Sequence, residues 1–153
     1  MGPQDKASHS SRGKTERTKT MFGQAGVWYV YLIYGFYHCL NVVTEKEDYP
    51  AAVLIRALEP KNGISQMQKN RKTDNIYNLT SGPGKLCQAF EINKNQNNTS
   101  AINRNSKLYI EDGIKISESQ IVSAKRIGID YAGDWKDRLL RFYIKDSKFI
   151  SKK

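Results

Sequence analysis

The sequence predicts an α+β fold: a single domain, residues 1–153, with a mostly antiparallel, curved sheet and a few short helices. Three observations lead to this prediction. A length of 153 residues suffices for one hydrophobic core and is too short for two. Runs of β-branched and aromatic residues are separated by turn residues, which indicates strands that follow one another closely. Two short stretches instead have the apolar spacing of helices.

The first 60 residues are expected to form a basic leader and three strands. Residues 1–20 are rich in Gly, Ser, Thr, Lys and Arg without periodicity, which predicts an irregular, flexible arm. Residues 27–34 are β-branched and aromatic and are typical of a strand. Gly35 interrupts the run before a second strand at 36–44, so the two form a hairpin with its bend at 34–35. A third strand is expected at 51–58.

Two helices and three further strands complete the expected elements. Residues 62–72 form a short helix with Ile64 and Met67 facing inward. A second helix, 83–90, begins with a proline in its first turn and has Leu86, Ala89 and Phe90 as its apolar stripe. Polar loops are expected on either side of it. The remaining strands are expected at residues 107–111, 120–129 and 139–144.

The charge of the chain predicts a polyanionic partner. Lys and Arg number 25 against 15 Asp and Glu, a net charge of +10. This favours nucleic acid over a merely solvated basic face, without choosing DNA, RNA or an anionic membrane surface. No apolar run reaches the roughly 18 residues of a membrane span, and no secretory signal is visible, so a cytoplasmic location is expected. Cys39 and Cys87 are expected to be reduced and buried, and two histidines make a zinc site improbable.

Tyrosines are concentrated around the predicted hairpin. Strand alternation places Tyr29 and Tyr31 on one face and Trp28 and Tyr34 on the other. Trp28 is assigned to the core. Each tyrosine hydroxyl needs a polar partner, and tyrosines beside a basic surface are suited to stacking on bases, at about 1–3 kcal/mol each. A tyrosine at a hairpin tip can also wedge between base pairs.

Two further features bear on chemistry. Arg56 lies within an apolar run, where a buried guanidinium needs a carboxylate, carbonyl or phosphate partner; an edge position with its head in water explains it equally well. Residues 82–85, Gly-Pro-Gly-Lys, lack the first glycine and the final Ser or Thr of a phosphate-binding loop. Nucleotide hydrolysis is therefore rejected, although Lys85 at a helix start could contact one backbone phosphate.

The ordered motifs resemble the methylpurine (3-methyladenine, alkyladenine) DNA glycosylase family, and together they cover nearly the whole chain. They are residues 2–10 (Gly-Pro-Gln-Asp-Lys-Ala-Ser-His-Ser), Met21-Phe22, 29–35 (Tyr-Val-Tyr-Leu-Ile-Tyr-Gly), Asn41, 54–60 (Leu-Ile-Arg-Ala-Leu-Glu-Pro), 81–89 (Ser-Gly-Pro-Gly-Lys-Leu-Cys-Gln-Ala), 126–129 (Arg-Ile-Gly-Ile) and 140–143 (Leu-Arg-Phe-Tyr).

The resemblance implies a monofunctional base-excision enzyme, a monomer without metal or organic cofactor, in the cytoplasm and with the nucleoid if bacterial. It would flip alkylated or deaminated purines from duplex DNA and hydrolyse the N-glycosidic bond, leaving an abasic site. Tyr34 would be the DNA wedge. His9, Tyr31 and Asn41 would line the base pocket. Arg56 and the carbonyl of Ile127 would position the water. The expected phosphate contacts are Arg12, Lys14, Arg17, Lys85 and Arg141.

One departure from the family pattern concerns the catalyst. The family's general base is a glutamate in a Glu-Ala-Tyr segment, which in register falls three residues before Met1 together with a pocket tyrosine. The expectation is a chain truncated at its front, lacking upstream strands, that excises little because water is not deprotonated. The alternatives are a non-catalytic module that binds damaged DNA and, on charge and aromatics alone, an RNA-binding sheet domain.

Overall fold

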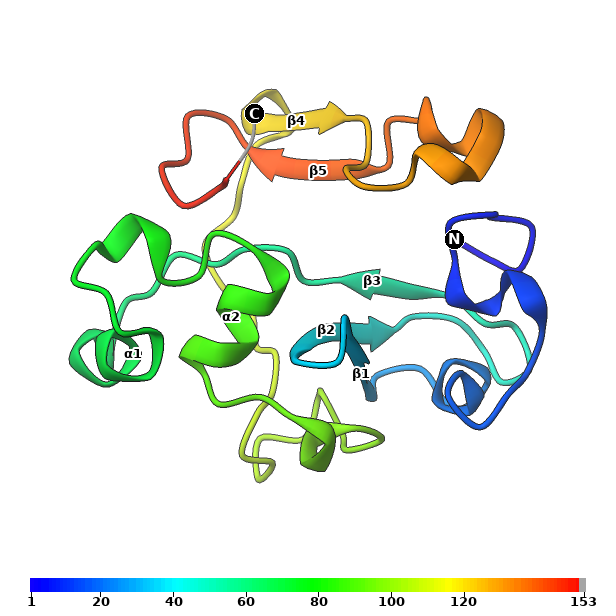
Figure 1. Ribbon diagram of the computed structural model, residues 1–153, viewed down its shortest axis with the longest axis horizontal. Coiled ribbons are helices and arrows are strands. Elements are labelled where there is room, and N and C mark those ends of the chain that lie inside the picture. Colours follow the sequence, from blue (N-terminus) through cyan, green and yellow to red (C-terminus); the bar gives the residue numbers. More distant parts are fainter. Residues whose placement is uncertain (152–153) are drawn as a thin grey trace.

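The computed structural model describes residues 1–151 and contains a three-stranded antiparallel sheet at its centre (Figure 1). Its strands are β1 (Trp28–Ile33), β2 (Tyr37–Val43) and β3 (Ala52–Leu54), in the order β1-β2-β3. The predicted hairpin is confirmed. Tyr34 and Gly35 turn the chain with positive φ angles of 54° and 78°, as a type I′ turn requires, and the Phe36 amide donates to the Ile33 carbonyl at 3.3 Å.

One face of this sheet packs against helix α2 (Pro83–Ala89), which in turn contacts α1 (Ile64–Arg71). Both predicted helices are confirmed. The core between β1, β2 and α2 consists of Trp28, Val30, Leu40, Leu86, Cys87, Ile92 and Ala101. The expectation that Phe90 belongs to the apolar stripe of this helix is wrong. Phe90 is 39% exposed because the helix ends at Ala89 and the chain turns away.

The second sheet is separate and has two antiparallel strands, β4 (Ile121–Ala124) and β5 (Arg141–Ile144). The expected single curved sheet is therefore wrong in detail: the fold is α+β, with two small, open sheets. The segment 107–111 is not a strand, because Leu108 packs on the core and its carbonyl accepts from Trp28 Nε1 at 3.0 Å. β3 is shorter than 51–58: beyond Leu54 the pairing continues with a single bond, from the Ile55 amide to Leu40.

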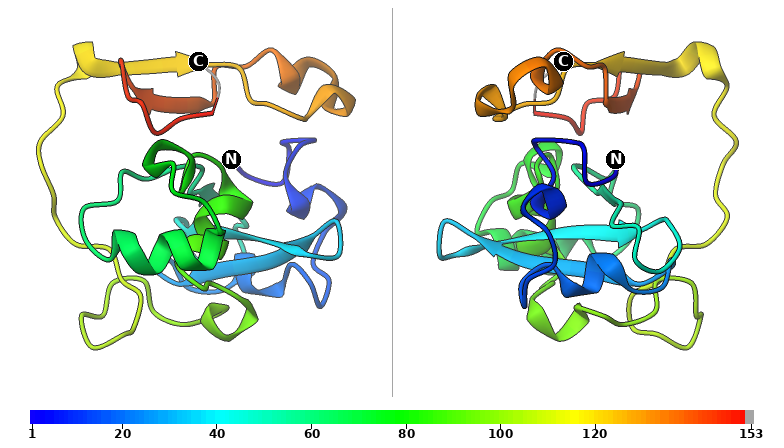
Figure 2. Two further views of the ribbon diagram at one scale, coloured as in Figure 1. Left: turned by 60° about the vertical axis from the view of Figure 1, so that its left-hand side comes forward. Right: turned by 90° about the vertical axis from the view of Figure 1, so that its right-hand side faces the viewer.

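The leader is ordered, which corrects the expectation of a flexible arm over residues 1–20. Hydrogen bonds from small polar side chains hold it in tight turns. Ser8 Oγ accepts from the Ser10 amide, and Ser10 Oγ, 1% exposed, donates to the Pro50 carbonyl at 3.4 Å. The leader runs along the first sheet, and its first residues lie between that sheet and the segment that joins β4 to β5 (Figure 2).

Short 3-10 helices fill the connections. They are η1 (His9–Arg12), η2 (Lys19–Phe22), η3 (Ile76–Asn78), η4 (Lys94–Gln96), η5 (Glu118–Gln120) and η6 (Asp130–Lys136). Within residues 1–151, no helix combines the length and apolar character that crossing a membrane requires.

Candidate base-binding site

The candidate site lies on the face of the first sheet opposite α2. The register pairs Tyr29 with Asn41 and Tyr31 with Cys39, so these four side chains share one face. His9, at the start of η1, contacts the two tyrosines. Its ring centroid is 4.1 Å from that of Tyr31, and its Nδ1 is 3.1 Å from the Tyr29 hydroxyl. The leader and the hairpin together build an aromatic wall.

The aromatic groups of the site are neutral at physiological pH. Burial raises the pKa of Tyr29 to about 12. Burial, followed by the neighbouring Cys39 thiol, raises the pKa of Tyr31 still further. Burial and then the positive charge of Arg17 lower the pKa of His9 below its usual 6.5. The hydroxyls therefore remain hydrogen-bond donors and the imidazole remains uncharged.

Arg56 stands beside this wall without a carboxylate partner. It follows β3 and is half-buried, and within residues 1–151 it forms no ion pair. Burial and then the charges of Arg141 and Arg126 lower its pKa, while the Cys39 thiol and Tyr31 hydroxyl oppose them. Leu54, two residues before Arg56, pairs with Asn41, so Arg56 leaves the sheet next to the pocket face. A half-buried guanidinium in this setting has donors available for a ligand or a water molecule.

Asn41 is locked by the backbone. It is 7% exposed, and its Nδ2 donates to the carbonyls of Tyr29 at 3.0 Å and Cys39 at 3.4 Å. Because the amide group spans two carbonyls, the side chain has a fixed position on the pocket face.

Tyr34 is in the turn between β1 and β2. This hairpin projects from the body of the molecule (Figure 2). The Tyr34 side chain is 79% exposed. It belongs to the turn and not to a strand face, so the expectation that it shares the Trp28 face is wrong. Phe36, 66% exposed, adds a second aromatic ring to the tip.

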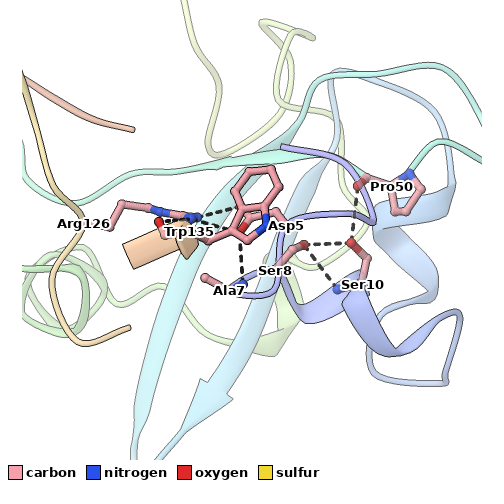
Figure 3. Close-up of polar contacts among 7 residues, drawn as sticks. All are labelled: Asp5, Ala7, Ser8, Ser10, Pro50, Arg126 and Trp135. Carbon is pink, nitrogen blue, oxygen red and sulfur yellow. Dashed lines mark hydrogen bonds and ion pairs between the residues drawn. The ribbon is translucent and has the colours of Figure 1, made fainter. Parts of the chain in front are cut away.

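Ile127 directly follows Arg126 in the chain. Arg126 forms an ion pair with Asp5 of the leader (Figure 3). Arg126 donates from Nη1 to Asp5 Oδ2 at 2.7 Å and from Nη2 to Oδ1 at 2.9 Å; Nη2 also reaches the Trp135 carbonyl at 3.4 Å. Burial would raise the pKa of Asp5, but the bonds from Arg126 and the Ala7 amide lower it overall. Sequence reasoning missed this pair, because the two residues are far apart in the chain. The Asp5 carboxylate also accepts from the Ala7 amide at 3.0 Å, as in an Asx-turn.

The five expected phosphate contacts are in different environments. Arg12 is exposed, and the exposed Lys14 lies 3.8 Å from Asp48. Arg17 instead donates to the Leu32 carbonyl at 2.7 Å, over the Tyr31 ring. Lys85 is half-buried and bonded to Asn78, and the half-buried Arg141 donates to the Lys125 carbonyl at 2.9 Å. The exposed cations of this set therefore lie in the leader, whereas Lys85 lies in α2 and is bonded to Asn78.

A cavity of about 330 Å³ lies on the opposite face and includes none of the predicted site residues. Its lining is mainly apolar and includes Leu40, Leu86 and Ile92. Its few polar groups give a ligand little to orient it, so we locate the chemistry at the aromatic wall instead.

A basic chain with a neutral aromatic wall, a half-buried arginine and an exposed tyrosine at a hairpin tip has the features of proteins that handle nucleic-acid bases. The family model for methylpurine-DNA glycosylase matches residues 1–148. The chain therefore belongs to the methylpurine-DNA glycosylase family, whose class is the DNA glycosylases that act in the repair of alkylated bases, and the resemblance read from the motifs is confirmed.

Curated relatives support the same assignment. Proteins named provisionally as 3-methyladenine DNA glycosylases are 48% identical in Clostridium perfringens (strain SM101) and 52% identical in Alkaliphilus oremlandii, each over 100% of this chain and 79% of the relative. A protein of the same provisional name in Legionella pneumophila (strain Lens) is 47% identical, over 99% of this chain and 75% of the relative.

Proposed function

We propose that this chain acts in base-excision repair as a monofunctional, monomeric DNA glycosylase. It flips an alkylated or deaminated purine out of duplex DNA and hydrolyses the N-glycosidic bond, leaving an abasic site. The observation that carries the proposal is the contact of His9 with Tyr29 and Tyr31, which builds a neutral aromatic wall on a strongly basic chain.

The wall favours a damaged purine by its electrostatics. An N-alkylated purine carries positive charge, and electron-rich tyrosine rings attract a cation over their faces. Neutral His9 offers a stacking surface without repelling such a base. The fixed amide of Asn41 limits which groups the pocket admits, because it is locked by two carbonyls and cannot move aside for a bulky purine substituent.

The hairpin and the leader supply the contacts with duplex DNA. Tyr34 fills the gap left by the flipped nucleotide, since it is exposed and held at the tip by the turn. Arg12 and Lys14, which are exposed, contact backbone phosphates. Each step uses side chains that the fold already presents toward solvent.

Hydrolysis needs a water molecule in place and a base to deprotonate it. Arg56 and the Ile127 carbonyl are proposed to orient the water. Asp5 cannot serve as the base, because both of its oxygens are engaged by Arg126. Because Asp5 is engaged in this way, non-catalytic damage recognition is the second candidate function.

The test uses a duplex oligonucleotide with one deoxyinosine. Excision is followed in single turnover by alkaline cleavage of the abasic site, with the Clostridium perfringens relative assayed in parallel. Binding is measured on a duplex with a stable abasic-site analogue. Excision above the rate without protein supports the glycosylase; tight binding without excision favours damage recognition; and equal, weak affinity for damaged and undamaged duplexes contradicts both.

A wedge variant tests the flipping step. Tyr34→Ser removes the exposed ring while leaving the turn, so affinity for the abasic-site duplex should fall about tenfold, in line with a stacking contribution of 1–3 kcal/mol. Tyr131→Ser, which removes another tyrosine that is 74% exposed, is the matched control. Equal affinities of Tyr34→Ser and the unmodified chain would contradict the wedge role.

A further inference from the structure

The buried Asp5–Arg126 pair connects two segments that the proposed reaction needs together. On the leader side, the Asp5 carbonyl accepts from the Ser8 amide at 2.8 Å, and Ser8 caps the 3-10 helix that begins at His9. On the other side, Arg126 directly precedes Ile127. The position of the Asp5 carboxylate thus influences that of His9. The position of the Arg126 guanidinium influences that of the Ile127 backbone.

The Asp5–Arg126 pair is one of the contacts that connect the layer of the second sheet with the rest of the molecule. β4 and β5 pair with each other and pack little against the helices and strands of the main body. Figures 1 and 2 show them as a separate layer above the first sheet. Besides Asp5–Arg126, the layer is tied by Phe149, whose ring lies 5.3 Å from that of Tyr77, and by Lys148 over the same ring. The ion pair lies next to Ile127, so its loss should loosen that end of the layer even though Ala132 and Trp135 stay buried.

The pair is better suited to orientation than to stability. Asp5 is 1% exposed and the Arg126 side chain is 17% exposed, so both charges pay a desolvation cost that buried ion pairs often fail to recover. Within residues 1–151, Arg126 Nε is buried and without a hydrogen-bond partner. The two parallel bonds of the guanidinium fork, in contrast, fix both distance and angle between the segments.

We infer that Asp5 and Arg126 are positioning residues, which hold His9 and the Ile127 carbonyl in a fixed mutual arrangement over the pocket. For the roles of His9 and Ile127 the inference rests on the proposed function; the coupling of the two segments stands on the contacts alone. Displacing a reacting group by about 1 Å can reduce a rate about a hundredfold, so a loosened Ile127 should slow excision much more than it weakens binding.

The decisive variant is the double substitution Asp5→Asn with Arg126→Gln. It removes both charges, so neither is left buried and unpaired, and it also removes the charged fork that sets the geometry. The neighbouring pair Lys125–Asp137, also at 2.7 Å but with side chains 62% and 55% exposed, provides the matched control as Lys125→Gln with Asp137→Asn. Arg126→Lys alone, which keeps both charges and removes the guanidinium fork, serves as a second, milder variant if the double variant folds poorly.

Two measurements together test the inference. The Ala132 amide is the nearest protected one, since it donates to the Ile129 carbonyl at 2.9 Å from a residue that is 0% exposed. Its hydrogen exchange should accelerate at least tenfold in the double variant and remain unchanged in the control. The single-turnover excision rate should fall at least tenfold while the Kd for the abasic-site duplex changes less than threefold. Unchanged exchange, or a rate loss matched by the loss of affinity, would overturn the inference. If the unmodified chain excises nothing, the proposed catalysis fails, and hydrogen exchange alone then decides whether the two segments are coupled.

Discussion

Replacing Asn41 by aspartate tests the locked amide of the pocket with almost no change in shape. Asn41 Nδ2 donates at 3.0 Å to one carbonyl and at 3.4 Å to another, from a side chain that is 7% exposed. The substitution removes about one and a half hydrogen bonds of roughly 1 kcal/mol each, since the longer one is weak. It also sets a carboxylate against two carbonyl oxygens, so we expect a total loss of about 3 kcal/mol in unfolding free energy at pH 7.

The sign of the pH dependence separates charge from packing. Burial and the facing carbonyls should raise the pKa of the new carboxyl group in the folded state above its unfolded value of about 3.9. The deficit should therefore shrink as the pH falls toward 5, because the folded variant then takes up a proton before the unfolded chain does. Protonation also restores one donor to the carbonyls.

The assay is urea unfolding followed by tryptophan fluorescence at pH 7 and pH 5, for the unmodified chain and for Asn41→Asp. Asn105→Asp introduces the same charge at an exposed position and is the control. A deficit that is the same at both pH values, or one no larger than that of the control, would refute the hydrogen-bonding account of Asn41.

Two further predictions concern the histidine and the core. Because burial and Arg17 lower the pKa of His9, its contribution to stability is complete above the unfolded value of about 6.5 and is lost as the pH falls below it. Unfolding free energies measured by urea titration should therefore decline from pH 7 to pH 5 less steeply in His9→Gln; equal slopes would contradict a neutral, buried imidazole. Leu86→Ala removes a side chain that is 0% exposed and should cost about 2–5 kcal/mol in the same titration. A loss below 1 kcal/mol would show that the contact between α2 and the first sheet is not part of the core.

Local signals account for the elements that the sequence predicted well. The hairpin was predicted because β-branched and aromatic residues flank a glycine. Both helices were predicted from apolar residues at helical spacing, a signal contained within a few neighbouring residues. The placement of Tyr31 and Asn41 on one face follows from strand alternation and the antiparallel register.

Long-range pairing decided the features that were missed. The ordered leader depends on contacts such as Ser10 with Pro50, 40 residues apart, and on Asp5 with Arg126, 121 residues apart. Residues 107–111 have strand composition, but their partner turned out to be the core around Trp28 and not another strand. Arg17 was expected at phosphates, yet a carbonyl lies within its reach at 2.7 Å. No local pattern encodes which distant group a side chain will meet.

The Asp5–Arg126 ion pair also determines the order in which parts of the chain fold during synthesis. A growing chain can form the β1–β2 hairpin from nearby residues, which close quickly. The Asp5 carboxylate, however, has no arginine to meet until Arg126 has left the ribosome, and it remains better solvated than buried until then. The leader is therefore expected to close over the aromatic wall only after Arg126 has emerged, so the pocket face of a nascent chain stays open until then.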